Sequence, residues 1–332
     1  MKVLVTGGSG FIGSRLIEGL LASGHDVTIF DKNPSHFYPS LVCPGDVRDL
    51  GQLAAAVRGK DLIFHLAAEH RDDVSPVSLY DEVNVGGAEN LIKALDATSC
   101  QRVIFTSSVA VYPLNAGTPN EDSPTCPFNP YGKSKLAAER VFKEWSGNRP
   151  GVSMTVIRPC VVFGERNRGN VFNLFKQISR GRFMMVGNGR NRKSMAYVGN
   201  LVAFLQSRMT AASGWHLFNY ADKPDLSTDE IISITRTSFG RAGLASRIQI
   251  PYFAGLTAGI AFDLLARITG RKYPISSIRI RKFCADTTVT ADRADQTGFK
   301  RPFTLSQGIK RMIQSEFLSG KSDDALFDTA GG

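Results

Sequence analysis

The sequence near the N-terminus reads Val3-Leu4-Val5-Thr6-Gly7-Gly8-Ser9-Gly10-Phe11-Ile12-Gly13, an apolar strand pattern that runs into a glycine-rich turn and an apolar helix. Glycine permits a tight turn and lets backbone amides approach phosphate oxygens, and the N-terminus of the helix offers unpaired N–H groups and a favourable dipole. A glycine pattern in this strand-to-helix context predicts a site for the pyrophosphate of a dinucleotide. The predicted contacts are Gly7, Gly10, Phe11, Ile12 and Gly13.

Apolar runs and amphipathic segments alternate through the first half of the chain. The predicted strands span 3–6, 27–31, 62–67, 103–107 and 154–158, and the predicted helices span 11–23, 50–58, 87–98 and 131–145. Strands that alternate with helices, and that are apolar along nearly their whole length, predict a parallel sheet covered on both faces. The predicted fold class is α/β, a Rossmann-type doubly wound parallel sheet with a smaller C-terminal substrate-binding region.

The pattern changes after Phe163, where shorter segments begin. We expect residues 1–163 to form an NAD-binding domain. Residues 164–318 should form mainly the substrate-binding region, partly interleaved with the main sheet through strands such as 215–220. We expect residues 319–332 to be a disordered tail.

Acidic residues follow two of the predicted strands. Asp31 ends the second strand, where a carboxylate accepts hydrogen bonds from a ribose diol and repels a 2′-phosphate. This position favours NAD over NADP, although the adjacent Lys32 softens the preference. Asp46 and Val47 lie at the predicted end of the next strand and could contact the adenine. A helix N-cap for the segment 50–58 is an equally good interpretation of Asp46.

Tyr131 and Lys135 are four residues apart on a predicted helix, so both side chains project from one face. An ammonium group beside a tyrosine favours the phenolate, and such a tyrosine can exchange a proton with a substrate hydroxyl. Ser107 and Ser108 follow the strand at 103–106 and therefore lie at the carboxyl edge of the sheet, where ligands bind in such folds. Ser108, Tyr131 and Lys135 are the predicted catalytic trio for hydride transfer at a carbinol or ketone carbon.

On these residues the chain resembles the extended short-chain dehydrogenase/reductase superfamily, and within it the NAD-dependent nucleotide-sugar epimerase/dehydratase family. The resemblance covers about residues 1–315 and includes His65-Leu66-Ala67-Ala68, Val83-Asn84-Val85, Asn129-Pro130-Tyr131 and Ile157-Arg158-Pro159. It implies further cofactor contacts from Leu66, Ala67, Ala68, Asn84, Ser107, Tyr131, Lys135 and Pro159.

The resemblance also implies a nucleotide sugar bound across the C-terminal region. Lys193 would contact the diphosphate, Asn170 would open the helix over the base, and Arg281 or Lys282 would add a phosphate contact. Ser108 and Tyr131 would contact the sugar. Two positions depart from the family pattern, because Val161 stands where many UDP-hexose epimerases have asparagine and Lys193 stands where arginine is usual.

The leading hypothesis is an NAD-dependent nucleotide-sugar epimerase that inverts C4 of a UDP-hexose or UDP-N-acetylhexosamine through a 4-keto intermediate. The segment after Ser108 lacks the carboxylates of a dehydratase. The alternatives are an NAD(P)H-dependent nucleotide-4-keto-sugar reductase, a 3β-hydroxysteroid-type dehydrogenase and a non-catalytic NAD(P)-sensing protein. Relatives are often homodimers, and the helices at 87–98 and 131–145 are the candidate interface.

The chain has a formal net charge of +10, and part of it gathers in one run of basic residues, namely Arg267, Arg271, Lys272, Arg279, Arg281 and Lys282. No nucleic-acid-binding signature accompanies this charge, so an anionic small substrate or a solvated surface is favoured over nucleic acid. The five cysteines are widely spread and predict neither a metal site nor disulfides. Without a signal-peptide pattern, we expect a cytoplasmic protein.

Residues 251–270 are apolar enough to suggest a membrane span. Asp263 and Arg267 interrupt the segment, and Gly255 and Gly259 weaken it, so we do not expect a transmembrane helix. The favoured interpretation is a helical cap on the substrate region, with at most weak membrane-surface contact. A membrane-surface helix, aided by the basic residues that follow, is the alternative.

Overall fold

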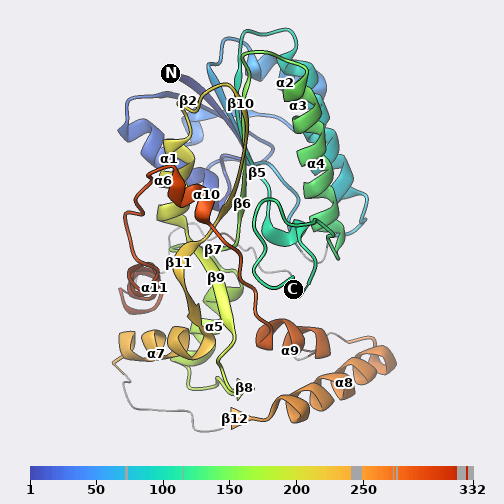
Figure 1. Ribbon diagram of the computed structural model, residues 1–332, viewed down its shortest axis with the longest axis vertical. Helices are drawn as coiled ribbons and strands as arrows, with labels where there is room; N and C mark the ends of the chain where they lie inside the picture. Colours follow the sequence, from blue (N-terminus) through green and yellow to red (C-terminus); the bar gives the residue numbers. More distant parts are fainter. Residues whose placement is uncertain are drawn as a thin grey trace.

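Seven parallel strands form the main sheet of the computed structural model, which describes residues 1–71, 74–114, 116–240, 249–271, 273, 276–319 and 327 (Figure 1). The strands are β1 (Lys2–Thr6), β2 (Asp26–Asp31), β3 (Val42–Pro44), β4 (Leu62–His65), β5 (Arg102–Thr106), β6 (Ser153–Pro159) and β10 (Gly214–Tyr220). Their order across the sheet is β10-β6-β5-β4-β1-β2-β3, so the direction of winding reverses between β1 and β4. Ligands bind at such a switch point in open parallel sheets.

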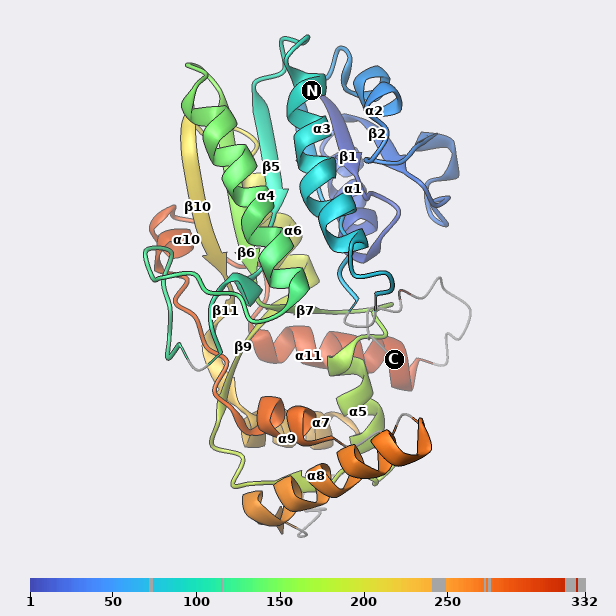
Figure 2. The same ribbon diagram turned by 90° about the vertical axis from the view of Figure 1, so that its right-hand side faces the viewer.

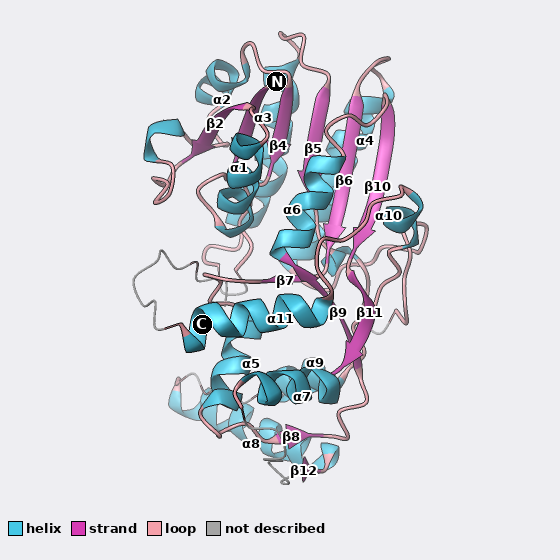
Figure 3. Cartoon of the chain, turned by 90° about the vertical axis from the view of Figure 1, so that its left-hand side faces the viewer, coloured by secondary structure: helices cyan, strands magenta, loops and turns pink. Residues whose placement is uncertain are grey.

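Helices cover both faces of this sheet because the strands are apolar on both sides. Along β1, Val3 and Val5 face one core, together with α1 (Phe11–Ala22) and α6 (Val198–Ser207) (Figure 3). Leu4 faces the opposite core, together with α2 (Leu50–Val57), α3 (Gly86–Leu95) and α4 (Pro130–Gly147) (Figure 2). The two-residue alternation of a strand produces this division. The predicted α/β fold with a doubly wound parallel sheet is confirmed.

A smaller region lies beyond the carboxyl edge of the main sheet (Figures 1 and 2). It contains a sheet with the order β11 (Asp222–Ser227), β9 (Arg192–Tyr197) and β7 (Val161–Phe163), and a pair formed by β8 (Met185–Val186) and β12 (Gln249–Ile250). Its helices are α5 (Asn170–Ser179), α7 (Thr228–Ser238), α8 (Tyr252–Thr269), α9 (Ser277–Cys284) and α11 (Leu305–Ile313), and α10 (Asp292–Gln296) lies beside β10. The remaining helical turns are η1 (Pro39–Leu41), η2 (Asp81–Val85), η3 (Val109–Val111) and η4 (Gln314–Leu318).

The chain crosses between the two regions more than once. β7 belongs to the smaller sheet, whereas α6 packs on α1 and β10 pairs with β6 at the edge of the main sheet. This arrangement agrees with interleaving, and the division at residue 163 stays a prediction. Most of the predicted tail, residues 320–326 and 328–332, lies outside the described residues, but Phe327 is described and contacts the rest of the chain.

Candidate active site

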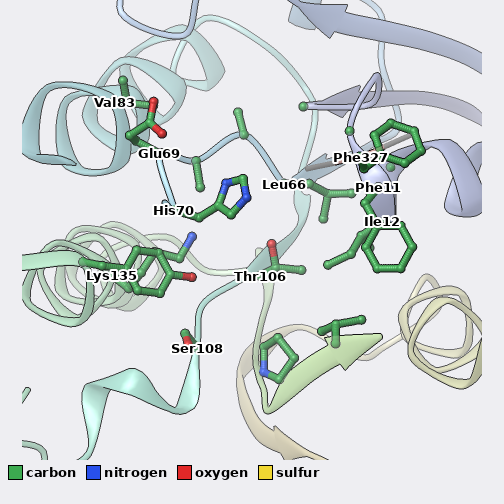
Figure 4. Close-up of a pocket in the computed structure, with 18 of the residues that line it drawn as sticks. Phe11, Ile12, Leu66, Glu69, His70, Val83, Thr106, Ser108, Lys135 and Phe327 are labelled. Atoms are coloured by element: carbon green, nitrogen blue, oxygen red, sulfur yellow. The ribbon is translucent and has the colours of Figure 1, made fainter. Parts of the chain in front are cut away.

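A cavity of about 830 Å³ opens at the carboxyl edge of the main sheet, between that edge and the smaller region (Figure 4). Residues that follow β1, β2, β4, β5 and β6 line one side, and α5 and α9 contribute to the other. Its location at the switch point is where this fold class binds ligands.

The glycine turn packs so closely that side chains cannot replace its glycines. Gly7 has a φ of +71°, and a Cβ on it would lie 2.6 Å from the amide nitrogen of Ala67. A Cβ on Gly13 would lie 2.6 Å from the carbonyl oxygen of Gly7. No side chain caps α1 at Gly10, so the amides of its first turn stay available for an anion. The predicted contacts Gly7, Gly10, Phe11, Ile12 and Gly13 all line the cavity, as does Ser9, and they fit a pyrophosphate.

Asp31 stands at the end of β2 and lines the cavity together with Lys32. Its carboxylate accepts hydrogen bonds from the amide of Ser9 at 3.0 Å and from the amide of Asn33 at 2.9 Å. These bonds fix the carboxylate and leave it able to accept from ribose hydroxyls, since two carboxylate oxygens offer about four acceptor sites. Its charge opposes a 2′-phosphate, so the site fits NAD.

Asp46 and Val47 also line the cavity. Asp46 forms an ion pair with Arg48, at 2.7 Å between Oδ2 and Nη2, and the hydrogen bond from this guanidinium lowers the pKa of the carboxyl. The N-cap of α2 is Asp49, whose carboxylate accepts from the amide of Gln52 at 3.0 Å. The interpretation of Asp46 as the helix cap is therefore wrong, and its role at the adenine remains a prediction.

Ser108, Tyr131 and Lys135 all line the cavity, and Figure 4 shows Ser108 and Lys135 on the same side of it. Helix α4 begins at Pro130 because the side chain of Asn129 accepts from the amide of Gly132 at 2.8 Å. A Cβ on Gly132 would overlap the carbonyl group of Ala110, so glycine lets the first turn of α4 approach the segment after Ser108.

Lys135 is 2% exposed, and its Nζ lies 4.4 Å from the centroid of the Phe105 ring. Burial lowers the pKa of Lys135 to about 7, against the opposing effect of the nearby Glu139 carboxylate. Burial disfavours the charged form of an amine, and such perturbed groups concentrate at functional sites. This lysine can therefore gain or lose a proton near neutral pH.

A buried charge network that the sequence analysis missed lies behind the trio. Glu139 accepts from Arg158 Nε at 2.9 Å and from Nη2 at 2.6 Å, and it also accepts from the hydroxyl of Ser107. Arg158 donates in turn to the hydroxyl of Tyr112 at 2.8 Å. The network ties α4 to β6 and to the end of β5. Its sequence signal is the spacing of four residues between Lys135 and Glu139, which puts both on one helix face.

Asn84 does not line the cavity, unlike the other predicted cofactor residues. Its side chain accepts from the amide of Glu69 at 2.8 Å and donates to the carbonyl oxygen of Glu69 at 3.0 Å and to the hydroxyl of Ser134 at 2.9 Å. Asn84 therefore joins the loop after β4 to α4. In the structure it positions this wall of the cavity from behind, whereas Leu66, Ala67, Ala68, Ser107 and Pro159 line the cavity directly.

Further residues line the cavity that the sequence analysis did not select. Glu69 and His70 extend the wall formed by the loop after β4, and Figure 4 shows His70 on the same side as Lys135. Burial lowers the pKa of His70, which favours a neutral imidazole. Phe327 also lines the cavity, with its ring centroid 6.1 Å from that of Phe11. Glu69 and His70 directly follow the quoted motif at 65–68, whereas no local pattern marks Phe327.

The four expected substrate contacts of the C-terminal region separate into two groups. Asn170, the first residue of α5, and Lys282 of α9 line the cavity, but Arg281 and Lys193 do not. Lys193 Nζ donates to the carbonyl oxygens of Lys282 at 2.9 Å and Ala285 at 2.6 Å, at the C-terminal end of α9. Burial lowers the pKa of Lys193 to about 8. A cation at a helix C-terminus is favourable. Lys193 therefore holds the C-terminal end of α9, the helix whose Lys282 lines the cavity.

Comparison with known proteins assigns the chain to a family. Residues 3–217 match the model described as NAD dependent epimerase/dehydratase family. The chain belongs to this family. It is 49% identical to an N-acetyl-alpha-D-glucosaminyl-diphospho-ditrans,octacis-undecaprenol 4-epimerase of Escherichia coli O157:H7, over 98% of both chains.

Two further likenesses bear on the alternatives. The solved structure of MoeE5 in complex with UDP-glucose and NAD has a TM-score of 0.74 and 25% identity, covering 95% of this chain and 98% of that one. A 3β-hydroxysteroid dehydrogenase/Delta 5-->4-isomerase of Mycobacterium tuberculosis is 38% identical, but over only 60% of this chain and 58% of that protein. The predictions of an extended short-chain dehydrogenase/reductase, of NAD as cofactor and of a sugar C4 epimerase are confirmed.

Proposed function

We propose that this enzyme interconverts the C4 epimers of an N-acetylhexosamine whose diphosphate is carried by a polyprenol. The relative of Escherichia coli O157:H7 is named for such a reaction, and it resembles this chain over 98% of both sequences. That span includes the smaller region, where we expect the substrate to bind.

The observation that carries the proposal concerns the two positions at which nucleotide contacts are expected. Val161 lines the cavity and is 44% exposed, so it presents an apolar side chain instead of an amide. Lys193 is engaged by two carbonyl groups of α9 and does not line the cavity. A carrier without base and ribose does not need an amide at position 161, but it keeps the diphosphate that Lys193 was expected to contact. Its diphosphate can still meet Lys282 through charge-assisted hydrogen bonds.

The proposed chemistry assigns one role to each residue of the trio. Tyr131 exchanges a proton with the C4 hydroxyl of the sugar, and Ser108 donates a hydrogen bond to the same oxygen as it becomes a carbonyl. Lys135, when protonated, favours the phenolate of Tyr131. NAD, held by the glycine turn and Asp31, supplies the hydride acceptor and donor when bound. Rotation of the 4-keto sugar between the two half-reactions gives the C4 epimer.

A competition between carriers tests the proposal. The purified protein is incubated with NAD and either N-acetylglucosaminyl diphosphate on a short polyprenol or UDP-N-acetylglucosamine, and the epimers are separated by chromatography and mass spectrometry. We expect epimer formation from the lipid-linked sugar without net formation of reduced nicotinamide. Conversion of the UDP-sugar without conversion of the lipid-linked sugar would contradict the polyprenol carrier. Stoichiometric consumption of NADH with a 4-keto sugar would instead identify a reductase.

UDP-N-acetylhexosamine is the second candidate substrate. It is supported by the likeness to MoeE5, whose structure holds UDP-glucose and NAD and which is 25% identical to this chain. The same incubation separates the two candidates, because only the carrier differs between its arms.

We propose further that the enzyme works in the cytoplasm as a homodimer and serves polysaccharide biosynthesis. Helices α3 and α4 lie side by side on the outer face of the sheet (Figure 2), and Ile92 and Val141 on them are only partly buried. Sedimentation velocity of the wild type and of Ile92→Glu/Val141→Glu tests this interface. We expect a dimer that the double variant splits into monomers, and a wild-type monomer at micromolar concentration would contradict it.

A further inference from the structure

Helix α8 (Tyr252–Thr269) has the composition of a membrane-binding segment. Among the described residues it is the one helix that is long and apolar enough to cross a bilayer, with a mean hydropathy of 1.2. Only Gly255 and Gly259 of its 18 residues are buried. The helix lies at the bottom of the molecule in Figures 1 and 2, at the opposite end from the main sheet. The predicted cap on the substrate region would have buried far more of it.

One face of α8 is fixed to the protein. A Cβ on Gly255 would lie 2.6 Å from Val186 Cγ1, and a Cβ on Gly259 would lie 2.8 Å from the amide nitrogen of Ser277. Asp263 accepts a hydrogen bond from the same Ser277 amide at 3.1 Å. Small residues thus bring this face close to β8 and α9, which fixes the direction in which the opposite face points.

The opposite face is apolar and exposed. Phe253 is 71% exposed, Ile260 51%, Leu264 59% and Ile268 73%, and helical spacing places these four side chains on the side away from Gly255 and Gly259. Soluble monomers rarely expose a contiguous apolar surface of this kind unless it binds something. A helix fastened along its glycine face cannot insert as a span, but it can lie in the plane of an interface.

Basic residues lie at the C-terminal end of α8 and on the neighbouring α9. Residues 249–285 contain six lysines and arginines and one acidic residue, Asp263. The net charge of this segment, six minus one, is half of the chain's net charge of +10. Arg267 and Arg271 stand at the C-terminal end of α8, and Arg281 and Lys282 are exposed on the neighbouring α9. An apolar face with a basic border complements a bilayer of anionic lipids.

We propose that α8 and α9 dock this protein on the surface of an anionic membrane, with α8 lying flat in the interface. The docking would also bring the bilayer near the cavity, because α9 packs against α8 and carries Lys282 into the cavity lining. A sugar diphosphate on a membrane lipid would then reach Lys282 from that side. The proposal rests on α8 itself and not on the identity of the substrate, so it is tested without any sugar present.

Vesicle flotation of the full chain tests this docking. Vesicles contain phosphatidylcholine with 30% phosphatidylglycerol (roughly the anionic share that attracts polybasic segments) or phosphatidylcholine alone. We expect the wild type to float with the anionic vesicles, less with the neutral ones and less at high salt. Replacing the apolar face in Ile260→Gln/Leu264→Gln/Ile268→Gln should reduce the partition coefficient at least about tenfold, since each buried CH₂ contributes to membrane affinity. Arg267→Gln/Arg271→Gln should reduce it by roughly fivefold per charge.

A matched control replaces three exposed apolar residues elsewhere, in Leu50→Gln/Val77→Gln/Leu114→Gln. The control should float like the wild type, and all variants should keep the wild-type circular dichroism spectrum and NAD affinity. The proposal is overturned if the wild type stays with the vesicle-free fractions, or if the apolar-face variant floats as well as the control. It is also overturned if that variant instead dissociates a wild-type dimer, since the face would then be covered by a second copy.

Discussion

Glu139 is the residue whose replacement tests the buried network most sharply. The side chain is 4% exposed and accepts two hydrogen bonds from Arg158, at 2.9 and 2.6 Å, and one from Ser107. Its charge also raises the pKa of Lys135 against the effect of burial. Glu139→Gln keeps the shape of the side chain and removes the charge, so two separate effects should appear.

The first effect is on stability. Arg158 is also 4% exposed, and its guanidinium would lose the one carboxylate to which it is paired in the described structure. Removing one partner of a buried pair costs about 3–5 kcal/mol. Because glutamine can still accept one hydrogen bond, we expect a loss near the lower end, about 3 kcal/mol. The urea midpoint of unfolding measures it.

The second effect is on the pH dependence of turnover. Without the Glu139 charge the pKa of Lys135 falls below about 7, so the protonated lysine disappears at a lower pH. The alkaline limb of the kcat/KM profile should therefore move to lower pH. Glu144→Gln is the control, since it lies exposed on the same helix. If Glu139→Gln unfolds at the wild-type urea concentration with an unshifted profile, the reasoning about this network is refuted.

Three further predictions concern single groups of the site. Burial holds the pKa of Lys135 at about 7 in the folded protein, against about 10.4 in an unfolded chain, so unfolding takes up a proton between these values. The free energy of unfolding should therefore rise with pH across this window by a few kcal/mol. Lys135→Met should abolish the rise. If the unfolding free energies of the wild type and the variant, measured in urea, change with pH in parallel, the prediction is wrong. Asp31→Asn should raise the ratio of NADP affinity to NAD affinity by about tenfold or more, because a carboxylate there selects against a 2′-phosphate. Isothermal titration with both cofactors measures this ratio, and an unchanged ratio would contradict the role of Asp31. Lys282→Gln should raise KM about tenfold with little change in kcat, the cost of one charge-assisted hydrogen bond, while Arg281→Gln should leave KM unchanged because Arg281 does not line the cavity.

The sequence predicts the parts of the site that depend on local chemistry. The glycine turn, Asp31 and the Tyr131–Lys135 helix face are set by residues close in the chain, and the structure gathers them on one cavity. The strands of the main sheet were predictable from short stretches too, because a strand covered on both faces is a continuous apolar run.

The parts that were missed depend on contacts between distant segments. The orientation of Lys193 is decided by the carbonyl groups of α9, about 90 residues later in the chain. Asn84 was expected at the cofactor, but its partners are the Glu69 backbone and the Ser134 hydroxyl. β11 escaped prediction because its sequence is polar and contains Pro224, which is typical of an edge strand. None of these features leaves a periodic signal in the sequence.

The exposure of α8 follows from a pattern that hydropathy alone does not reveal. The average apolar character of residues 251–270 fits both a cap, which was favoured, and a surface helix. The spacing of Gly255 and Gly259 decides which face packs on the protein, and the structure shows that the larger apolar side chains point away from it. The expectation of at most weak membrane contact therefore gives way to the docking proposal.

The Tyr131 hydroxyl is proposed to exchange the proton of the C4 hydroxyl, and Tyr131→Phe probes this exchange when epimer formation and NAD affinity are measured on the same preparation. Tyr80→Phe is the control, because the Tyr80 ring lies 6.4 Å from that of Tyr131 without lining the cavity. Loss of a general acid and base should slow epimerisation by about 10²–10⁴-fold while NAD still binds. Epimer formation by Tyr131→Phe at the wild-type rate would rule out this acid and base role of Tyr131.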